Sequence, residues 1–267
     1  MKISVVTISF NQAQFLEACL DSIAIQEGPW EHIIVDAGST DGSRDIIERR
    51  RSQFSHIVLE PDDGPADGLN KGFERASGEL LYYLNSDDIV LEGAFSQARA
   101  AFLASPSLDV ISGHGDVVDE TGCKLRCVYS DPISRHRLAY GGGILVQPAT
   151  FMRREMFESV GGFNSENRSS WDGELVVDMF LNGAKFGICD SQWGGFRLHD
   201  DSITASAKLA SLMKHWAEQR YLKLMGRDIP AYAGIFRRLY ALERVLRHPT
   251  AIQARLTGQR VFGSKQK

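Results

Sequence analysis

Two spacings of apolar residues alternate along the first third of the chain. Short runs of β-branched and other apolar residues, typical of buried strands, are separated by segments whose apolar residues recur three and four positions apart, as on one helix face. The expected strands are 3–9, 31–36, 57–60 and 80–85, and the expected helices are 15–26, 43–54 and 66–76. This alternation predicts right-handed βαβ units. The fold class is therefore α/β, with a Rossmann-like, mostly parallel sheet flanked by helices.

The pattern is less regular in the middle of the chain. Apolar runs at 110–118 and 125–129 predict a hairpin, and the segment 171–182 predicts a helix. Residues 186–198 are expected to form two short strands that meet around Ser191.

Charge separates the end of the chain from the rest. Residues 208–267 hold 13 Lys and Arg against three acids, whereas residues 1–207 hold 17 basic and 31 acidic residues. The apolar spacing also becomes helical throughout after Thr204. We therefore expect a catalytic domain at 1–203 and a basic helical extension at 204–267.

Composition excludes several classes of protein. Of the 267 residues, 43% are hydrophobic and 24% are charged, as in ordinary globular proteins. No stretch approaches the roughly 20 apolar residues that span a bilayer, and the net charge of −4 argues against a general nucleic-acid binder. The chain begins with a strand-like segment and has only four cysteines. We therefore expect a cytoplasmic protein without a secretory leader or a disulfide framework.

Polar residues follow each of the first four expected strands. Ligands of an open parallel sheet bind beyond the carboxyl ends of its strands, so these residues are candidates for one common site. Turns and helix caps can account for some of them, and capping alone can account for Asp41. Capping explains Asp36 and the pair Asp87-Asp88 less well.

The adjacent carboxylates Asp87 and Asp88 would repel each other unless they share a positive charge. Mg²⁺ and Mn²⁺ prefer carboxylate oxygens together with phosphate oxygens and water, so the pair indicates a metal that binds a diphosphate. The sequence has no Gly-x-x-x-x-Gly-Lys-Ser/Thr loop, which excludes a P-loop NTPase. It also has no Gly-x-Gly-x-x-Gly turn after the first strand, which counts against a nicotinamide dehydrogenase.

Several motifs occur in an order that resembles one family of enzymes. They are Ser4-Val5-Val6-Thr7-Ile8-Ser9-Phe10-Asn11, Asp36-Ala37-Gly38-Ser39-Thr40-Asp41-Gly42-Ser43, Asp67-Gly68-Leu69-Asn70-Lys71-Gly72, Leu84-Asn85-Ser86-Asp87-Asp88, Gln147-Pro148-Ala149-Thr150-Phe151, Gly161-Gly162-Phe163 and Trp171-Asp172. With these motifs, the chain as far as His199 resembles family 2 glycosyltransferases. Members of this family are inverting enzymes of the GT-A fold that use nucleotide sugars.

The resemblance implies a role for each strand end. Thr7 and Ser9 would line the nucleotide pocket, and Asp36 would accept a hydrogen bond from the base, since a carboxylate has no proton to donate. Asp67 and Lys71 would contact the nucleotide and the diphosphate. The same nucleotide-sugar site would include Asn11, Gly38, Ser39, Asn85 and, near the ribose or the sugar, Asp87.

The resemblance also implies a metal cofactor, Mn²⁺ or Mg²⁺. Asp88 would be the direct ligand, and His199 matches the histidine that often joins the metal shell in this fold. A structural role is the alternative for His199, because a lone histidine is more often structural.

Asp172 is the candidate catalytic base. Inversion by a single displacement requires one carboxylate to accept the proton of the acceptor hydroxyl. The family usually has an acidic pair at this position, whereas this chain has Trp171 before Asp172. Glu174 is therefore a competing base, and helix capping is the structural alternative for Asp172.

Residues 234–248 predict a basic amphipathic helix. Phe236, Leu239, Tyr240 and Leu246 can share one side of it, and arginines occupy the remainder. Such a helix can lie on an anionic membrane. The alternative is that its apolar side packs on the catalytic domain or on a second subunit, as in a homo-oligomer.

These features together predict an inverting, metal-dependent hexosyl- or N-acetylhexosaminyltransferase. Its donor would be a nucleotide-diphosphate sugar, most simply UDP-linked, and its acceptor a saccharide or lipid-linked saccharide of cell-surface polysaccharide synthesis. One alternative is a sugar nucleotidyltransferase, which should carry a Gly/Arg-rich loop where this chain has Asn11-Gln12-Ala13-Gln14. The other is a catalytically inactive nucleotide-sugar-binding module of the same fold.

Overall fold

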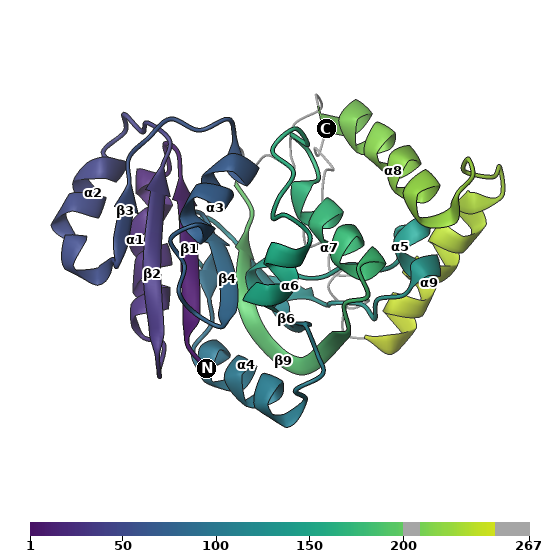
Figure 1. Ribbon diagram of the computed structural model, residues 1–267, viewed down its shortest axis with the longest axis horizontal. Coiled ribbons are helices and arrows are strands. Elements are labelled where there is room, and N and C mark those ends of the chain that lie inside the picture. The colour runs from purple at the N-terminus through teal and green to yellow at the C-terminus, as the bar shows by residue number, and fades with distance from the viewer. Residues whose placement is uncertain (200–208, 249–267) are drawn as a thin grey trace.

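The computed structural model describes residues 1–199 and 209–248, and within these residues nine strands form one sheet. The first four strands are β1 (Ile3–Ser9), β2 (Trp30–Asp36), β3 (His56–Val58) and β4 (Leu80–Asn85). Between them lie α1 (Ala13–Ala24), α2 (Ser43–Arg49), the 3₁₀ turn η1 (Arg51–Gln53) and α3 (Pro65–Phe73). The four strands are parallel, in the order β3-β2-β1-β4 (Figure 1). The predicted βαβ arrangement is therefore present.

The second half of the sheet is mixed. Its elements are β5 (Ile89–Val90), α4 (Ala94–Ala104), β6 (Val110–Val118), β7 (Lys124–Val128), η2 (Gln147–Ala149), β8 (Thr150–Arg153) and β9 (Phe186–Arg197). The sheet continues from β4 in the order β8-β6-β9-β5, and β7 pairs with β6 as the predicted hairpin. β8 is antiparallel to both of its neighbours, whereas β9 is parallel to β6.

The expectation of two short strands at 186–198 is wrong, because β9 is one strand of 12 residues. Between the pairs Ser112–Ile188 and His114–Gln192, β9 has two residues more than β6. The polar residues around Ser191 therefore mark a bulge, which bends a strand without ending it. β9 accordingly follows a curved path across the sheet (Figure 1).

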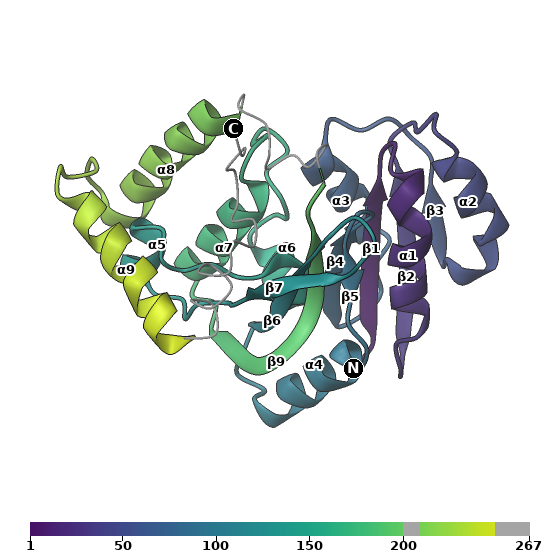
Figure 2. The same ribbon diagram turned by 180° about the vertical axis from the view of Figure 1, so that it is seen from behind.

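Helices cover both faces of the sheet. On one face, shown in Figure 2, Phe95 of α4 packs in a core with Val5 of β1. On the other, α3, α6 (Arg154–Ser159) and α7 (Trp171–Leu181) place Leu69 and Leu175 in a core with Val6. Consecutive β1 residues thus point to opposite faces, and strands covered on both sides read as continuous apolar runs.

The C-terminal helices α8 (Leu209–Met225) and α9 (Ala233–Arg247) pack on α5 (Arg135–Ala139) and α7. Tyr140, Val177 and Tyr221 belong to this third core, and the hydroxyls of Tyr140 and Tyr221 are 3.0 Å apart. Residues 209–248 therefore share a core with elements that precede residue 199. The expected boundary at 203/204 lies outside the described residues. Within residues 1–199 and 209–248, no helix is both long enough and apolar enough to cross a membrane.

The faces of α9 differ from the predicted single apolar side. Phe236 and Tyr240 point inward, and Tyr240 donates to or accepts from Nδ1 of His136 in α5 at 2.5 Å. Leu239 and Leu246 lie on the exposed side, with 52% and 70% of their surface accessible. The prediction that all four residues share one side is therefore wrong, because α9 is apolar on two sides and only one of them is packed.

Candidate active site

The loops after β1 and β2 are held together by side chains predicted for the nucleotide site. The amide of Asn11 donates to the Ser39 hydroxyl at 2.9 Å, and the Asn11 side-chain oxygen accepts from the Thr40 amide at 2.9 Å. Asn11 has a φ of 52°, which asparagine tolerates better than most residues. Asp41 accepts from the amides of Ala13 at the start of α1 and Ser43 at the start of α2. The capping role expected for Asp41 is thus observed.

Asp36 is fully buried and its oxygens are occupied within the protein. They accept from the amides of Gly38 and Ser39, from the Ser39 hydroxyl, and from Nε of Arg44 at 2.7 Å. Burial raises the pKa of Asp36, but the hydrogen bonds from Ser39 and Arg44 outweigh burial and hold it below its usual value. Arg44 was not recognisable from the sequence, since it reads as an ordinary surface residue of a helix.

Ser9 and Thr7 differ in what their hydroxyls contact. Thr7 is fully buried, and its hydroxyl lies 2.9 Å from Nε2 of His32. Burial, with Arg50 nearby, lowers the pKa of His32 to about 3, so the imidazole is neutral. The Ser9 hydroxyl is buried at the end of β1 and has no hydrogen-bond partner in residues 1–199 and 209–248. Ser9 therefore has a polar atom to offer a ligand, whereas Thr7 is engaged with β2.

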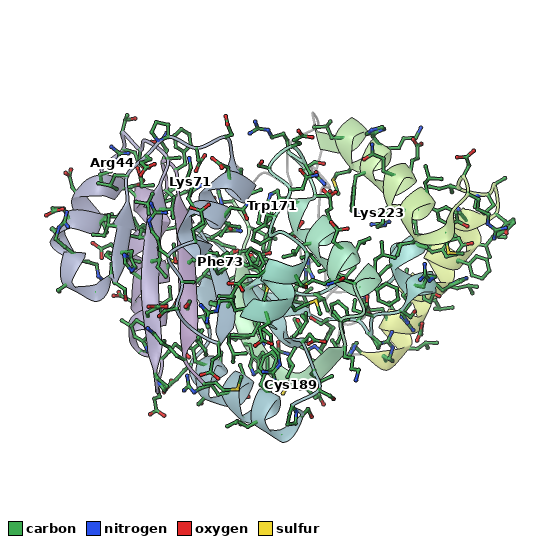
Figure 3. All side chains as sticks on the ribbon, viewed as in Figure 1. Arg44, Lys71, Phe73, Trp171, Cys189 and Lys223 are labelled. Carbon is green, nitrogen blue, oxygen red and sulfur yellow. The ribbon has the colours of Figure 1, made fainter. Side chains whose placement is uncertain are left out.

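Asp67 and Lys71 form an ion pair at the start of α3. Nζ of Lys71 lies 3.0 Å from Oδ2 of Asp67 and donates to the Pro61 carbonyl at 2.7 Å. Hydrogen bonds from the Asp63 amide and from Lys71, with Arg168 nearby, lower the pKa of Asp67. Figure 3 shows Lys71 and Arg44 along the edge where the parallel strands end.

Arg168 comes from a distant part of the chain, the segment before α7. A Cβ atom at Gly64 would lie only 2.7 Å from its guanidinium, so Arg168 covers the turn that leads into α3. Its cation therefore lies close to the expected diphosphate contacts. The sequence carried no signal for this residue.

Asp87 and Asp88 are held by the end of β9. Oδ2 of Asp87 is 3.0 Å from Nε2 of His199, and Oδ1 of Asp88 accepts from the Arg197 amide at 2.9 Å. The buried Arg197 also donates to the Asp87 carbonyl at 2.7 Å. His199 therefore lies beside the acidic pair, and its role as a metal ligand stays a prediction. Arg197, which holds both aspartates in place, was not predicted from the sequence.

The acidic pair fits a divalent metal as part of a ligand set. Within the described part of the chain, no three His, Cys, Asp or Glu side chains form a ready-made metal centre. However, Oδ2 of Asp88 is buried without a partner, and burial together with the charge of Asp87 raises the pKa of Asp88. Mg²⁺ typically takes one or two carboxylates and completes its shell with substrate phosphates and water. An unpartnered carboxylate oxygen beside a second carboxylate suits that arrangement.

A cavity of about 960 Å³ lies between η2, α7 and α8. Asp172, the second residue of α7, lines it and accepts from the Gly173 amide at 2.7 Å. The side chain is exposed to the cavity but is otherwise surrounded by protein, and this burial raises the pKa of Asp172. Gln147 also lines the cavity and accepts from Asn85 at 3.3 Å, so this wall adjoins the strand that leads into Asp87.

Glu174 and Trp171 have structural partners. Glu174 accepts from the side-chain amides of Asn164 and Asn167, the latter at 2.7 Å, and it is not among the residues that line the cavity. Trp171 packs against Tyr83 with ring centroids 5.6 Å apart (Figure 3). Of the two carboxylates on this turn, Asp172 is therefore the one that faces the cavity.

The sequence model of glycosyl transferase family 2 matches residues 4–161. The chain belongs to glycosyltransferase family 2. Among its relatives, a PGL/p-HBAD biosynthesis glycosyltransferase of Mycobacterium bovis is 32% identical over 187 residues, which cover 68% of this chain and 70% of that protein. An uncharacterized glycosyltransferase of Nostoc sp. is 30% identical over 226 residues, covering 79% of this chain and 69% of that protein.

Solved structures share the fold of this family 2 glycosyltransferase. Residues 1–349 of TarS from S. aureus, in complex with UDP-GlcNAc, are 20% identical with a TM-score of 0.63 and cover 83% of this chain and 67% of that one. Mannosyltransferase PcManGT from Pyrobaculum calidifontis, in complex with GDP-Man and Mn²⁺, is 19% identical with a TM-score of 0.62, covering 94% and 73%. The predicted α/β class and GT-A fold are confirmed by these neighbours.

The predicted site residues of this family 2 glycosyltransferase form three groups. Asn11, Asp36, Gly38 and Ser39 share one hydrogen-bonded loop pair, and Asp67 pairs with Lys71. Asp87, Asp88 and His199 meet at the ends of β4 and β9. Asp172 stands apart from all three groups, in the wall of the cavity.

Proposed function

We propose that this family 2 glycosyltransferase is an inverting enzyme that transfers a hexosyl or N-acetylhexosaminyl group from a UDP-linked sugar to a hydroxyl of a saccharide or lipid-linked saccharide. One arrangement carries the proposal. A carboxylate in a cavity, Asp172, is separated by Gln147 and Asn85 from an acidic pair with an unpartnered oxygen. An inverting displacement needs a base on one side of the reacting carbon and a group that stabilises the leaving diphosphate on the other.

The donor half of the proposal rests on the strand ends. The hydroxyl of Ser9 and the buried oxygen of Asp88 are without partners in the described residues, as expected of groups that bind a ligand. Lys71 and Arg168 bring positive charge to the neighbouring turn. Structural neighbours bound to UDP-GlcNAc and to GDP-Man with Mn²⁺ support a nucleotide-sugar donor.

Asp87 and Asp88, with His199 beside them, would hold Mn²⁺ or Mg²⁺. When bound, the ion would supply positive charge to the diphosphate as it leaves. Both carboxylates adjoin the end of β4, so the diphosphate would lie along the edge that also carries Lys71.

Asp172 would act on the acceptor. Its carboxylate would accept the proton of the attacking hydroxyl while the new bond forms at the anomeric carbon and the bond to the diphosphate breaks. The raised pKa of Asp172 makes it a stronger base than an ordinary aspartate. Glu174 is less suited to this role, because two asparagine side chains occupy it.

We also propose that α9 contacts an anionic membrane surface from the cytoplasmic side. Ile235, Leu239, Leu242 and Leu246 recur at helical spacing and are each at least half exposed. An apolar stripe on a basic helix suits a membrane interface. The alternative is that a second copy of the chain packs against this stripe. The basic residues after 248 lie outside the described part of the chain.

The test is a screen of nucleotide sugars for metal-dependent hydrolysis and for thermal stabilisation of the purified protein. A ligand at 100 times its dissociation constant stabilises a protein by about 2.7 kcal/mol. The proposal expects one UDP-sugar to be hydrolysed in the presence of Mn²⁺ or Mg²⁺. Stabilisation by a donor without any turnover, alone or with sugar acceptors, would instead indicate an inactive binding module. The family match already favours glycosyl transfer over nucleotidyl transfer.

A further inference from the structure

The cavity that contains Asp172 has a basic wall on the side of the C-terminal helices. Arg220 of α8 and Arg237 of α9 both line it. Neither forms a hydrogen bond or an ion pair with any other residue in the described ranges, and Nε of Arg220 is buried without a partner. Burial and the nearby charge of Arg237 lower the pKa of Arg220. Two arginines thus lie near each other, and neither is paired with an acid in the described ranges.

Other arginines near α9 are neutralised, which makes this pair unusual. Arg244 and Arg247 both pair with the buried carboxylate of Asp131, and Arg137 pairs with Glu243. These three arginines are paired with an acid, and Arg135 of α5 donates to the Leu224 carbonyl instead, so each of the four has a partner in the protein. A partly buried guanidinium left without one costs free energy unless a ligand compensates it.

Trp216 is a further residue of this wall and lies next to Asp172. Trp216 of α8 is buried in the same wall, and its Nε1 lies 3.8 Å from the position that a Cβ atom would take at Gly173, the residue after Asp172. Its indole N–H has no hydrogen-bond partner among the described residues. The ring itself packs in the core with Tyr140 and Tyr221, so what it can offer a sugar is its N–H, as a donor to a hydroxyl. A saccharide against Trp216 would lie beside Asp172.

We propose that the acceptor carries an anionic group, a phosphate or a carboxylate, which Arg220 and Arg237 bind while the sugar hydroxyl lies at Asp172. This inference rests on the proposed function, since it takes the cavity to be the acceptor site. The guanidinium group matches both anions by paired N–H donors. Lys214 adds a third cation to the cavity, and Glu218 is the one acid that α8 contributes to it, so this wall keeps a net positive charge.

The test is a calorimetric titration of the full-length protein with three probes. They are inorganic phosphate, methyl glucuronide as a carboxylate-bearing sugar, and methyl glucoside as its neutral counterpart, each added with UDP already saturating. We expect one or both anions to bind, and the glucuronide to bind at least tenfold more tightly than the glucoside if the carboxylate is the recognised group. Binding of phosphate without a preference for the glucuronide assigns a phosphate-bearing acceptor.

Variants identify the site. Arg220→Gln and Arg237→Gln are each expected to weaken binding of the recognised anion at least tenfold. Arg238→Gln is the matched control, because Arg238 is an exposed arginine of the same helix that does not line the cavity, and its affinity should stay within twofold of wild type. The inference is overturned if neither anion binds the wild-type protein, or if both variants bind as the wild type does.

Two further measurements separate anion binding from a purely structural role of the two arginines. A structural role for Arg220 predicts a lower melting temperature for Arg220→Gln, whereas an unpaired ligand-binding arginine predicts no loss. Arg237 is exposed, so its variant tests anion binding even if the Arg220 variant does not fold. Donor hydrolysis by the wild-type protein is measured in parallel. If hydrolysis is absent, the proposed function fails. If hydrolysis is present and anion binding ignores both arginines, only the inference about the acceptor fails.

Discussion

Replacing Asp172 by asparagine should remove the base while leaving the fold intact. A general base contributes about 10²–10⁴-fold to the rate, equivalent to about 3–5 kcal/mol of barrier. Asp172 accepts one hydrogen bond, from the adjacent Gly173 amide, and the asparagine oxygen can still accept it. We therefore expect transfer to fall by at least 10²-fold with no more than a small change in melting temperature. Initial rates with a saturating donor, and the donor affinity in a separate titration, provide the measurement.

The pH profile gives the same prediction a second readout. The base works only when it is deprotonated, and burial raises the pKa of Asp172. Activity should therefore be lost as the pH falls through a value above that of an ordinary aspartate, which is about 3.9. In Asp172→Asn this acid limb of kcat/KM should disappear. An unchanged acid limb in that variant would assign the titration to another group.

Glu174→Gln is the matched control, since it removes a carboxylate two positions away. Glu174 accepts from Asn164 and Asn167, so its loss should cost about 1–2 kcal/mol of stability. For a chain of this size that is a fall of about 2–8 °C in melting temperature. Transfer should persist below the new melting range. If Glu174→Gln is inactive and Asp172→Asn is active, the base has been assigned to the wrong residue.

Three further predictions concern the proposed metal ligand Asp88, the ion pairs of Asp131 and the exposed leucines of α9. Asp88→Asn should abolish turnover and the thermal shift caused by Mn²⁺. It should not lower stability in metal-free buffer, because Oδ2 of Asp88 has no protein partner in the described residues. Retained activity in metal-replete buffer would contradict the metal assignment. Asp131→Asn should lower the free energy of unfolding in urea by about 2–4 kcal/mol, because it leaves Arg244 without its acid and Arg247 with Glu243 alone. A change below about 1 kcal/mol would speak against a docked α9. Leu239→Ser combined with Leu246→Ser should weaken sedimentation with anionic vesicles while donor hydrolysis continues, and equal sedimentation would defeat the membrane proposal.

The edge of the sheet that is proposed to bind the donor, at the carboxyl ends of the parallel strands, was largely predictable from the sequence. Each parallel strand is an apolar run that ends in polar residues, and parallel strands necessarily bring those ends to one side of the sheet. The chain order of Asp36 and Asp87 was therefore enough to place them along one edge, whereas Asp67, which lies in α3, was assigned to the site by the family resemblance. The bulge in β9 was not predictable in the same way, because the polar residues around Ser191 fit a turn and a bulge equally well.

Lys71 was predicted, but the arginines of the site escaped prediction for a different reason. Arg44 and Arg168 each read locally as surface residues. Arg44 turns back onto Asp36, eight positions earlier, and the position of Arg168 depends on how the segment before α7 packs on the turn before α3. Arg220 and Arg237 line one cavity only because α8 and α9 both pack beside it. Side chains at strand ends are placed by the sheet itself, whereas those on helices are placed by tertiary contacts that no local pattern reports.

α8 lies outside the part of the chain that the family model matches. The family match ends at residue 161. It includes Asp36, Asp87 and Asp88 at the strand ends, but it includes neither His199 nor α8, which forms a wall of the cavity. On α8 itself, Lys214 and Arg220 line the cavity, Leu224 lies in the core shared with α5, and Trp216 belongs to both. With the cavity as the proposed acceptor site, acceptor preference would depend on the side chains that α8 turns toward the cavity, while the core side of the helix holds it in place. Paralogues with the same donor chemistry would then be expected to differ most at these wall positions, which makes α8 a natural place to graft new acceptor preferences.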